Sequence, residues 1–122
     1  MVVYNPAEET VNGLFHALSD ATRRDIVRRC ALEATSVSRL AGPYPMSFAA
    51  VQKHVAVLER AGLVSKERRG REQIVHADRE ALRKARQAVE RLEALWRDRV
   101  ARMDDLLAER EEVAAPEERK QK

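Results

Sequence analysis

The stretch MSFAAVQKHVAVLERAGLV, residues 46–64, decides the fold of this chain. Ser47 is a favourable N-cap and Gly62 can take the left-handed conformation that ends a helix, so the stretch predicts a helix over residues 47–61. One face of this helix is apolar and suits a protein core, since it carries Val51, Val55 and Leu58. The other face presents Gln52 and Lys53, with His54 at the boundary, and packing alone does not explain it.

The segment before this helix predicts a shorter helix followed by a tight turn. Thr35 and Ser36 can open the short helix, whose apolar residues are Val37, Leu40 and Ala41. The sequence Gly42-Pro43-Tyr44-Pro45 then stops it, because each proline lacks a backbone N–H and restricts the residue before it. A short helix, a turn and a second amphipathic helix form a helix-turn-helix, in which the second helix enters the major groove of DNA.

The segment after it predicts a charged β-hairpin. Residues 63–69 and 72–76 are expected as two short strands, and Gly70-Arg71 between them allows a tight turn. Cations are frequent in this hairpin, namely Lys66, Arg68, Arg69 and Arg71, against the anions Glu67 and Glu72. Beside a helix-turn-helix, a basic wing over residues 63–76 can reach flanking phosphates or the minor groove, where each cation displaces condensed counterions.

Three further helices are predicted around this motif. The first has apolar residues at i, i+3, i+4 and i+7, which are Val11, Leu14, Phe15 and Leu18. Ser19 and Asp20 can cap the second, whose inner face carries Ile26, Val27 and Cys30. Asp78 can cap a final helix that reaches about Glu112. The predicted fold class is therefore mainly α with a small β-hairpin wing, a winged helix-turn-helix.

The final helix has more apolar surface than one small domain readily covers. One row recurs every seven positions, namely Leu82, Val89, Trp96 and Met103, and a companion row that Arg99 interrupts holds Ala85, Leu92 and Leu106. A second stripe widens the apolar face with Leu95, Val100 and Leu107. Packing on its own domain is one explanation, but we favour a partner helix, and hence a two-fold homodimer that the first helix completes. The predicted dimer-interface residues are Val11, Leu14, Phe15, Leu82, Val89, Leu92, Trp96, Val100, Met103 and Leu107.

Length and composition set outer bounds on the class of protein. The 122 residues predict one domain, residues 1–112, and a polar, disordered tail, residues 113–122. Lys and Arg outnumber Asp and Glu by 23 to 20, and this excess is too small to establish nucleic-acid binding by itself. No apolar run approaches the roughly 18–20 residues that cross a bilayer, and no signal peptide opens the chain, so we expect a cytoplasmic protein without membrane contact.

The residues expected to contact DNA lie in the predicted recognition helix and wing. Gln can pair with adenine, and Lys can donate to guanine or to phosphate. The alternatives stay open for each group: Gln52 and Lys53 as solvated surface, His54 as a locally bonded residue, Ser47 as a cap alone, and the arginines as solubilising charges. The predicted set is Ser47, Phe48, Gln52, Lys53, His54, Lys66, Arg68, Arg69 and Arg71.

Two motifs in this order resemble a known family. ALSDATRRDIVRRC, residues 17–30, resembles the Leu-x-Asp-x-Thr-Arg-Arg-x-Ile stretch of ArsR-type winged-helix repressors. Residues 46–76 resemble their Met-Ser-x-x-Ala-Val-x-x-His-Leu-x-x-Leu-x-x-Ala-Gly-Leu-Val recognition helix and wing. The Trp96-bearing helix is similar to the non-metal-binding subgroup associated with START-like proteins. The resemblance implies a homodimer that binds an operator inverted repeat in double-stranded DNA and so represses its own operon. It also implies that the protein releases this DNA when an inducer or chemical signal arrives.

Departures from the family argue against a metal site. Metal sensors of this type carry Cys-Val-Cys in the third helix, where this chain has Ser36 and Ser38, and neutral hydroxyls bind soft metals poorly. A second type of site pairs Asp with His on the last helix, but no histidine follows His76. We therefore predict no metal and no cofactor. Gln52 stands where many relatives have Ser, which is expected to change the operator sequence that is read.

Other functions remain as alternatives. A metal- or redox-responsive sensor is one, although Cys30 shares a helical face with Ile26 and Val27, which favours a buried, inert thiol. A winged-helix protein-interaction module is another. An enzyme is not expected, because no nucleophile–base pair, Gly-rich phosphate loop or carboxylate cluster is evident in the sequence.

Overall fold

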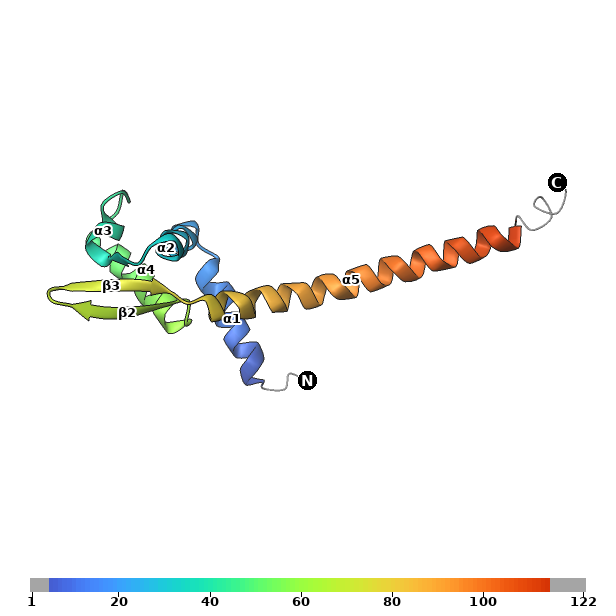
Figure 1. The fold of residues 1–122 in the computed structure, drawn as a ribbon, viewed down its shortest axis with the longest axis horizontal. Helices are drawn as coiled ribbons and strands as arrows, with labels where there is room; N and C mark the ends of the chain where they lie inside the picture. The colour runs from blue at the N-terminus through green and yellow to red at the C-terminus, as the bar shows by residue number, and fades with distance from the viewer. Residues whose placement is uncertain (1–4, 115–122) are drawn as a thin grey trace. The chain divides into compact units, whose positions relative to one another are not determined.

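The chain folds into five helices and three strands over the residues that its computed structural model describes, 5–114 (Figure 1). The elements follow in the order α1 Pro6–Leu18, α2 Ala21–Leu32, β1 Thr35–Ser36, α3 Val37–Ala41, α4 Phe48–Arg60, β2 Val64–Arg69, β3 Glu72–Ala77 and α5 Arg79–Ala114. The chain divides between Arg86 and Gln87 into two units. The first unit contains the winged helix-turn-helix that the sequence predicts.

Side-chain caps begin the helices where the sequence places them. The Asp20 carboxylate accepts a hydrogen bond from the backbone N–H of Arg23 at 3.0 Å, which starts α2. Ser47 accepts from the N–H of Ala50 at 3.1 Å and starts α4. Such caps satisfy backbone donors that have no partner within the helix. Gly62, at φ +81°, ends the α4 segment in the left-handed conformation that favours glycine.

The sheet has one strand more than the predicted hairpin. β2 and β3 pair antiparallel around Gly70, and β1 adds to the other side of β3 to give the order β1-β3-β2. Thr35 lies opposite Val75 in this ladder, while Ser36 lies opposite Ile74 and also caps α3. The sequence missed β1 because two residues carry no hydrophobic alternation. The extra strand fixes the start of the helix-turn-helix to the wing.

The core of the first unit is aliphatic and takes residues from α1 to α4, β2, β3 and the start of α5. Its fully buried large residues are Leu14, Ile26, Leu40, Val51, Val55, Leu58, Leu63 and Val75. Leu14 thereby differs from its predicted place in a dimer interface, because it is 1% exposed and packs within its own chain. On α1, half-buried Val11 and exposed Phe15 are the predicted interface residues that remain at the surface.

Helix α5 has 36 residues and extends to Ala114, two residues into the predicted tail. The rest of that tail, residues 115–122, lies outside the described residues. Asp78 caps the helix by accepting from the N–H groups of Glu80 at 2.9 Å and Ala81 at 3.3 Å. Within residues 5–114, no helix is both long enough and apolar enough to span a membrane.

Candidate nucleic-acid interface

Helix α4 separates its residues into a buried face and an unengaged polar face. Val51, Val55 and Leu58 are at most 1% exposed, whereas Gln52 and Lys53 are exposed. Within residues 5–114, neither Gln52 nor Lys53 takes part in a side-chain hydrogen bond or ion pair. The helix is therefore anchored by its apolar side and leaves an amide and an ammonium group available to another molecule.

The turn between α3 and α4 is held against α2 by Tyr44. Its hydroxyl donates to the Asp25 carboxylate at 2.6 Å. The Arg29 guanidinium lies 5.4 Å from the centre of the Tyr44 ring and donates to the carbonyls of Leu40 at 3.0 Å and Arg39 at 3.2 Å. These contacts fix the angle at which α4 leaves the turn, and they join residues that are distant in the sequence.

Removing the Tyr44 hydroxyl is expected to destabilise the fold. Tyr44→Phe keeps the ring and its contact with Arg29 but leaves Asp25 without its shortest hydrogen bond. A hydrogen bond to a charged group contributes about 1.5 kcal/mol, so the free energy of unfolding should fall by roughly that amount at neutral pH. Urea denaturation measures it, and equal midpoints for the two proteins would show that the bond does not hold the turn.

The same variant should change the acid sensitivity of the fold. The hydrogen bond from Tyr44, followed by that from Arg28, lowers the pKa of Asp25, while burial, followed by the hydrogen bond to Asp25, raises the pKa of Tyr44. A carboxyl with a lowered folded-state pKa stabilises the fold above its unfolded pKa, and this contribution disappears as the pH falls through the folded pKa. The difference between the denaturation midpoints of wild type and Tyr44→Phe should therefore begin to shrink near pH 4, the unfolded pKa range of Asp, and should vanish only below the lowered folded-state pKa of Asp25.

His54 bonds locally, in a network that joins α4 to the ends of α1 and α2. Arg23 donates to the carbonyls of Ala17 at 2.7 Å and His16 at 3.2 Å, and its Nη1 lies 3.3 Å from Nδ1 of His54. Arginine can only donate, so this Nδ1 accepts and a neutral His54 carries its proton on Nε2. Asp20 lies 3.9 Å from the same nitrogen, and the backbone N–H of Arg23 lowers the pKa of Asp20. The network connects residues of both family-like motifs.

Two of the predicted wing cations have anionic partners within the chain. Lys66 shares a sheet face with buried Val64 and lies 3.4 Å from Glu59 of α4. On the other face, Glu67 contacts both Arg69 and His76 at 3.0 Å, and the hydrogen bond from Arg69 is the main cause that lowers the pKa of Glu67. These pairs reduce the net positive charge along the wing.

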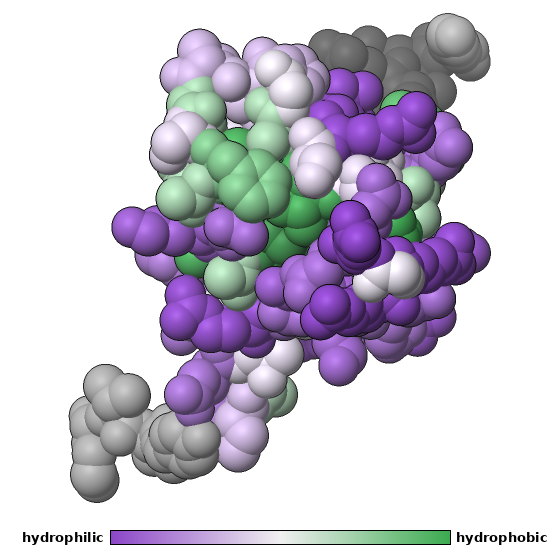
Figure 2. Space-filling view, turned by 90° about the vertical axis from the view of Figure 1, so that its left-hand side faces the viewer, coloured by the Kyte–Doolittle hydropathy of each residue, from purple (hydrophilic) through white to green (hydrophobic). Residues whose placement is uncertain are grey.

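Arg68 and Arg71 are the wing cations without an ion pair in the described part of the chain. Arg68 donates to the neutral carbonyl of Gly70 at 3.3 Å, and Arg71 is exposed in the turn. Figure 2 looks at the side toward which the hairpin points in Figure 1, and it shows hydrophilic residues around a smaller hydrophobic area. Glu72 also lies beside the turn, opposite Arg69, so the hairpin tip presents a net positive charge to an anionic polymer but not an unopposed one.

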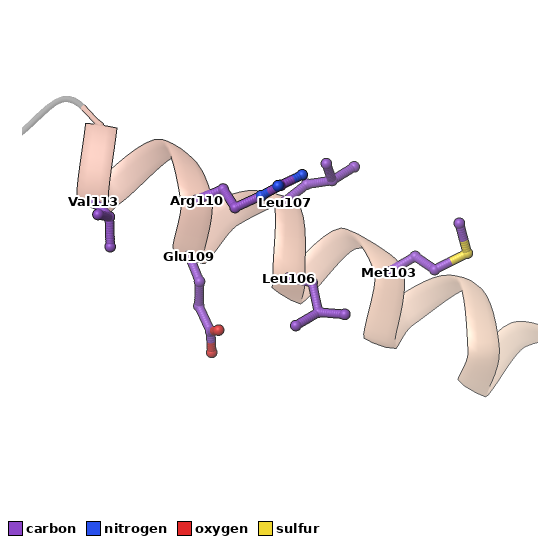
Figure 3. A pocket seen from close by; sticks show the side chains of 6 residues that line it. All are labelled: Met103, Leu106, Leu107, Glu109, Arg110 and Val113. Atoms are coloured by element: carbon purple, nitrogen blue, oxygen red, sulfur yellow. The ribbon is translucent and has the colours of Figure 1, made fainter.

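Helix α5 leaves its heptad rows uncovered in the second unit. Several predicted interface residues there are between 40% and 67% exposed, namely Val89, Leu92, Trp96, Val100, Met103 and Leu107. A shallow hollow near the end of this helix is lined by Met103, Leu106, Leu107, Glu109, Arg110 and Val113 (Figure 3). All six residues belong to one helix, so the hollow is the flank of α5 and not an enclosed ligand cavity. Leu82 differs, because it is half-buried against the core of the first unit.

The side chains that could bind a metal ion or respond to oxidation do not form a site in the described part of the chain. Within residues 5–114, no cluster of three or more His, Cys, Asp or Glu side chains could hold a metal ion. Ser36 is buried and caps α3, whereas Ser38 is exposed. Burial raises the pKa of the Cys30 thiol, which disfavours the reactive thiolate.

Solved structures similar to this one are transcriptional regulators. A crystal structure of an ArsR family transcriptional regulator shares 30% sequence identity, with a TM-score of 0.71 over 80% of this chain and 97% of that chain. An ArsR-like transcriptional regulator from Rhodococcus shares 33% identity, with a TM-score of 0.71 over 81% of this chain and 93% of the other. A homodimeric winged helix-turn-helix DNA-binding domain from Mycobacterium bovis, at 22% identity and a TM-score of 0.56 over 83% and 91% of the two chains, supports the fold alone. No family model and no curated protein matches the sequence.

Proposed function

The chain belongs to the ArsR family of transcriptional regulators, and from that premise we propose that it is a cytoplasmic homodimer that represses its own operon by binding an inverted repeat. The observation that carries the proposal is that the side chains of Gln52 and Lys53 are exposed and have no partner within the described residues. Both side chains are exposed and unengaged on a helix whose opposite face is buried. Polar groups held on a fixed scaffold can meet base edges without first breaking contacts within the protein.

In this proposal α4 lies in the major groove and the hairpin follows the flanking backbone. Gln52 pairs with adenine through its amide, and Lys53 donates to guanine or to a phosphate. Ser47 and Phe48 stand where the helix begins, the part that approaches the bases in helix-turn-helix complexes. Arg68 and Arg71 contact phosphates, which position the protein but carry no sequence information.

The uncovered face of α5 supports the dimer. Exposed apolar residues at heptad spacing are stabilised when a second helix covers them. An isologous pairing of two chains would present two identical winged helix-turn-helix units to one DNA duplex. Phe15 of α1 is a further exposed apolar side chain that a partner could cover. A dimer with two-fold symmetry is expected to bind an operator with the same symmetry, whose half-sites lie about one helical turn of DNA apart.

Binding to the DNA upstream of its own gene tests this proposal. Fluorescence anisotropy should give an affinity for that duplex at least about a thousandfold above that for a shuffled duplex at the same salt concentration. Equal affinities for both duplexes would contradict sequence-specific repression. A specific complex that leaves transcription in vitro unchanged would remove the repressor role and keep the DNA-binding one.

Loss of a wing cation should weaken binding to all sequences alike. Arg68→Ala or Arg71→Ala removes a cation that neutralises a phosphate, so the slope of log affinity against log salt should become shallower by about one for each such cation removed. Lys84→Ala, an exposed cation of α5, is the matched control and should leave the slope unchanged. A loss of affinity confined to one base pair would instead mean that the wing reads sequence.

A further inference from the structure

Phe48 is an exposed aromatic residue that the core of the first unit does not use. It is the first residue of α4 and 46% exposed. Tyr44 and Met46, just before it in the chain, both pack against the hydrophobic core, whereas Phe48 is not among the residues that do. The other large apolar residues exposed in the described part of this unit are Phe15 and Leu32, which lie on α1 and α2.

The position of Phe48 on α4 places it beside the predicted base-reading residues. Residues four apart on a helix are neighbours on one face, with Cβ atoms about 5–6 Å apart, so Phe48 lies next to Gln52. The Ser47 cap fixes the first turn from which the ring projects. A phenyl ring also has few rotatable bonds, so holding it against a ligand costs little conformational entropy.

We propose that Phe48 is a specificity-determining residue that packs against the C5-methyl group of a thymine, next to the base pair that Gln52 reads. This inference rests on the proposed function. The thymine methyl is the apolar group that B-DNA presents at base edges in the major groove, and Phe is among the side chains that contact it. Phosphates and the polar edges of the other bases offer a phenyl ring no comparable partner.

Phe48 and Gln52 together therefore predict the identity of two neighbouring base pairs in each half-site. Phe48 selects thymine by its methyl group, and Gln52 selects adenine by two hydrogen bonds. A half-site should contain two neighbouring A·T pairs, with the thymine nearer to the start of α4. Burial of one methyl group corresponds to about fourfold in affinity per half-site.

Replacing thymine by uracil tests the contact, because uracil lacks the methyl group and keeps the hydrogen-bonding groups. Duplexes are selected from a random-sequence pool by the full-length protein, and each thymine of the consensus is then replaced by deoxyuridine. Wild type should lose about fourfold in affinity at one thymine per half-site, and more than about tenfold when both half-sites are changed. Phe48→Ala should bind the thymine duplex about as weakly as wild type binds the doubly substituted one, and should not respond to uracil at that position.

Two further variants separate the contact from general effects. Phe48→Leu keeps an apolar side chain and should keep part of the uracil response, so loss of fold alone cannot produce the result. Leu32→Ala removes an exposed apolar side chain elsewhere and should respond to uracil like wild type. A full uracil response in Phe48→Ala, or none at any thymine in wild type, overturns the inference while the proposed function stands. Failure of the wild type to enrich any sequence overturns the proposed function itself.

Discussion

Replacing Gln52 and Lys53 together by alanine is expected to remove most of the sequence-specific DNA binding while leaving the fold intact. Each good base contact contributes about 1–3 kcal/mol of discrimination, and a homodimer makes each of these contacts twice. Affinity for the operator should therefore fall at least about a hundredfold, toward the affinity for random duplex. Stability should change by less than about 0.5 kcal/mol, because both side chains are exposed and unengaged.

The measurement is a pair of anisotropy titrations, with operator and with shuffled duplex, together with urea denaturation. Lys84→Ala serves again as the control for the loss of one surface cation. If the double variant still prefers the operator by the wild-type margin, another surface reads the sequence.

A charge placed in the apolar face of α5 is expected to separate the dimer. Trp96 is 63% exposed in the single chain, but in the proposed dimer it is covered by the partner helix. Trp96→Glu would bury a carboxylate without a partner, which costs several kcal/mol per protomer and applies twice across a two-fold axis. Sedimentation at micromolar concentration should show a monomer, and operator binding should weaken with it.

Ala94→Glu is the matched control, because it adds the same charge to the same helix away from the heptad rows. That variant should sediment as a dimer and bind the operator normally. A dimer in the Trp96→Glu protein would place the interface elsewhere on the chain.

Local signals in the sequence were sufficient for most of the fold. Caps and stops act over three or four residues, so Asp20, Ser47 and Gly62 could be assigned from their neighbours alone. Apolar spacing likewise predicted the buried face of α4, and Gly70 predicted the position of the hairpin turn. The exposure of Gln52 and Lys53 followed from the same spacing.

Contacts between distant residues could not be predicted in this way. Tyr44 and Asp25 are 19 residues apart, and Arg23 and His54 are 31 apart, so no periodicity connects them. The pairing of Lys66 with Glu59 likewise depends on the register of β2 against α4. Leu14 satisfied the helical spacing of an interface as well as that of a core, and only the packing of α1 on its own chain distinguishes the two.

Hydroxyl-radical and base-methylation footprinting on the DNA upstream of the gene tests the proposed geometry most directly. Two copies of α4, held by one dimer, should protect two major-groove patches related by two-fold symmetry, with centres roughly 10 base pairs apart. A single protected patch, two patches without symmetry, or uniform protection along the duplex would contradict a two-fold reader of an inverted repeat.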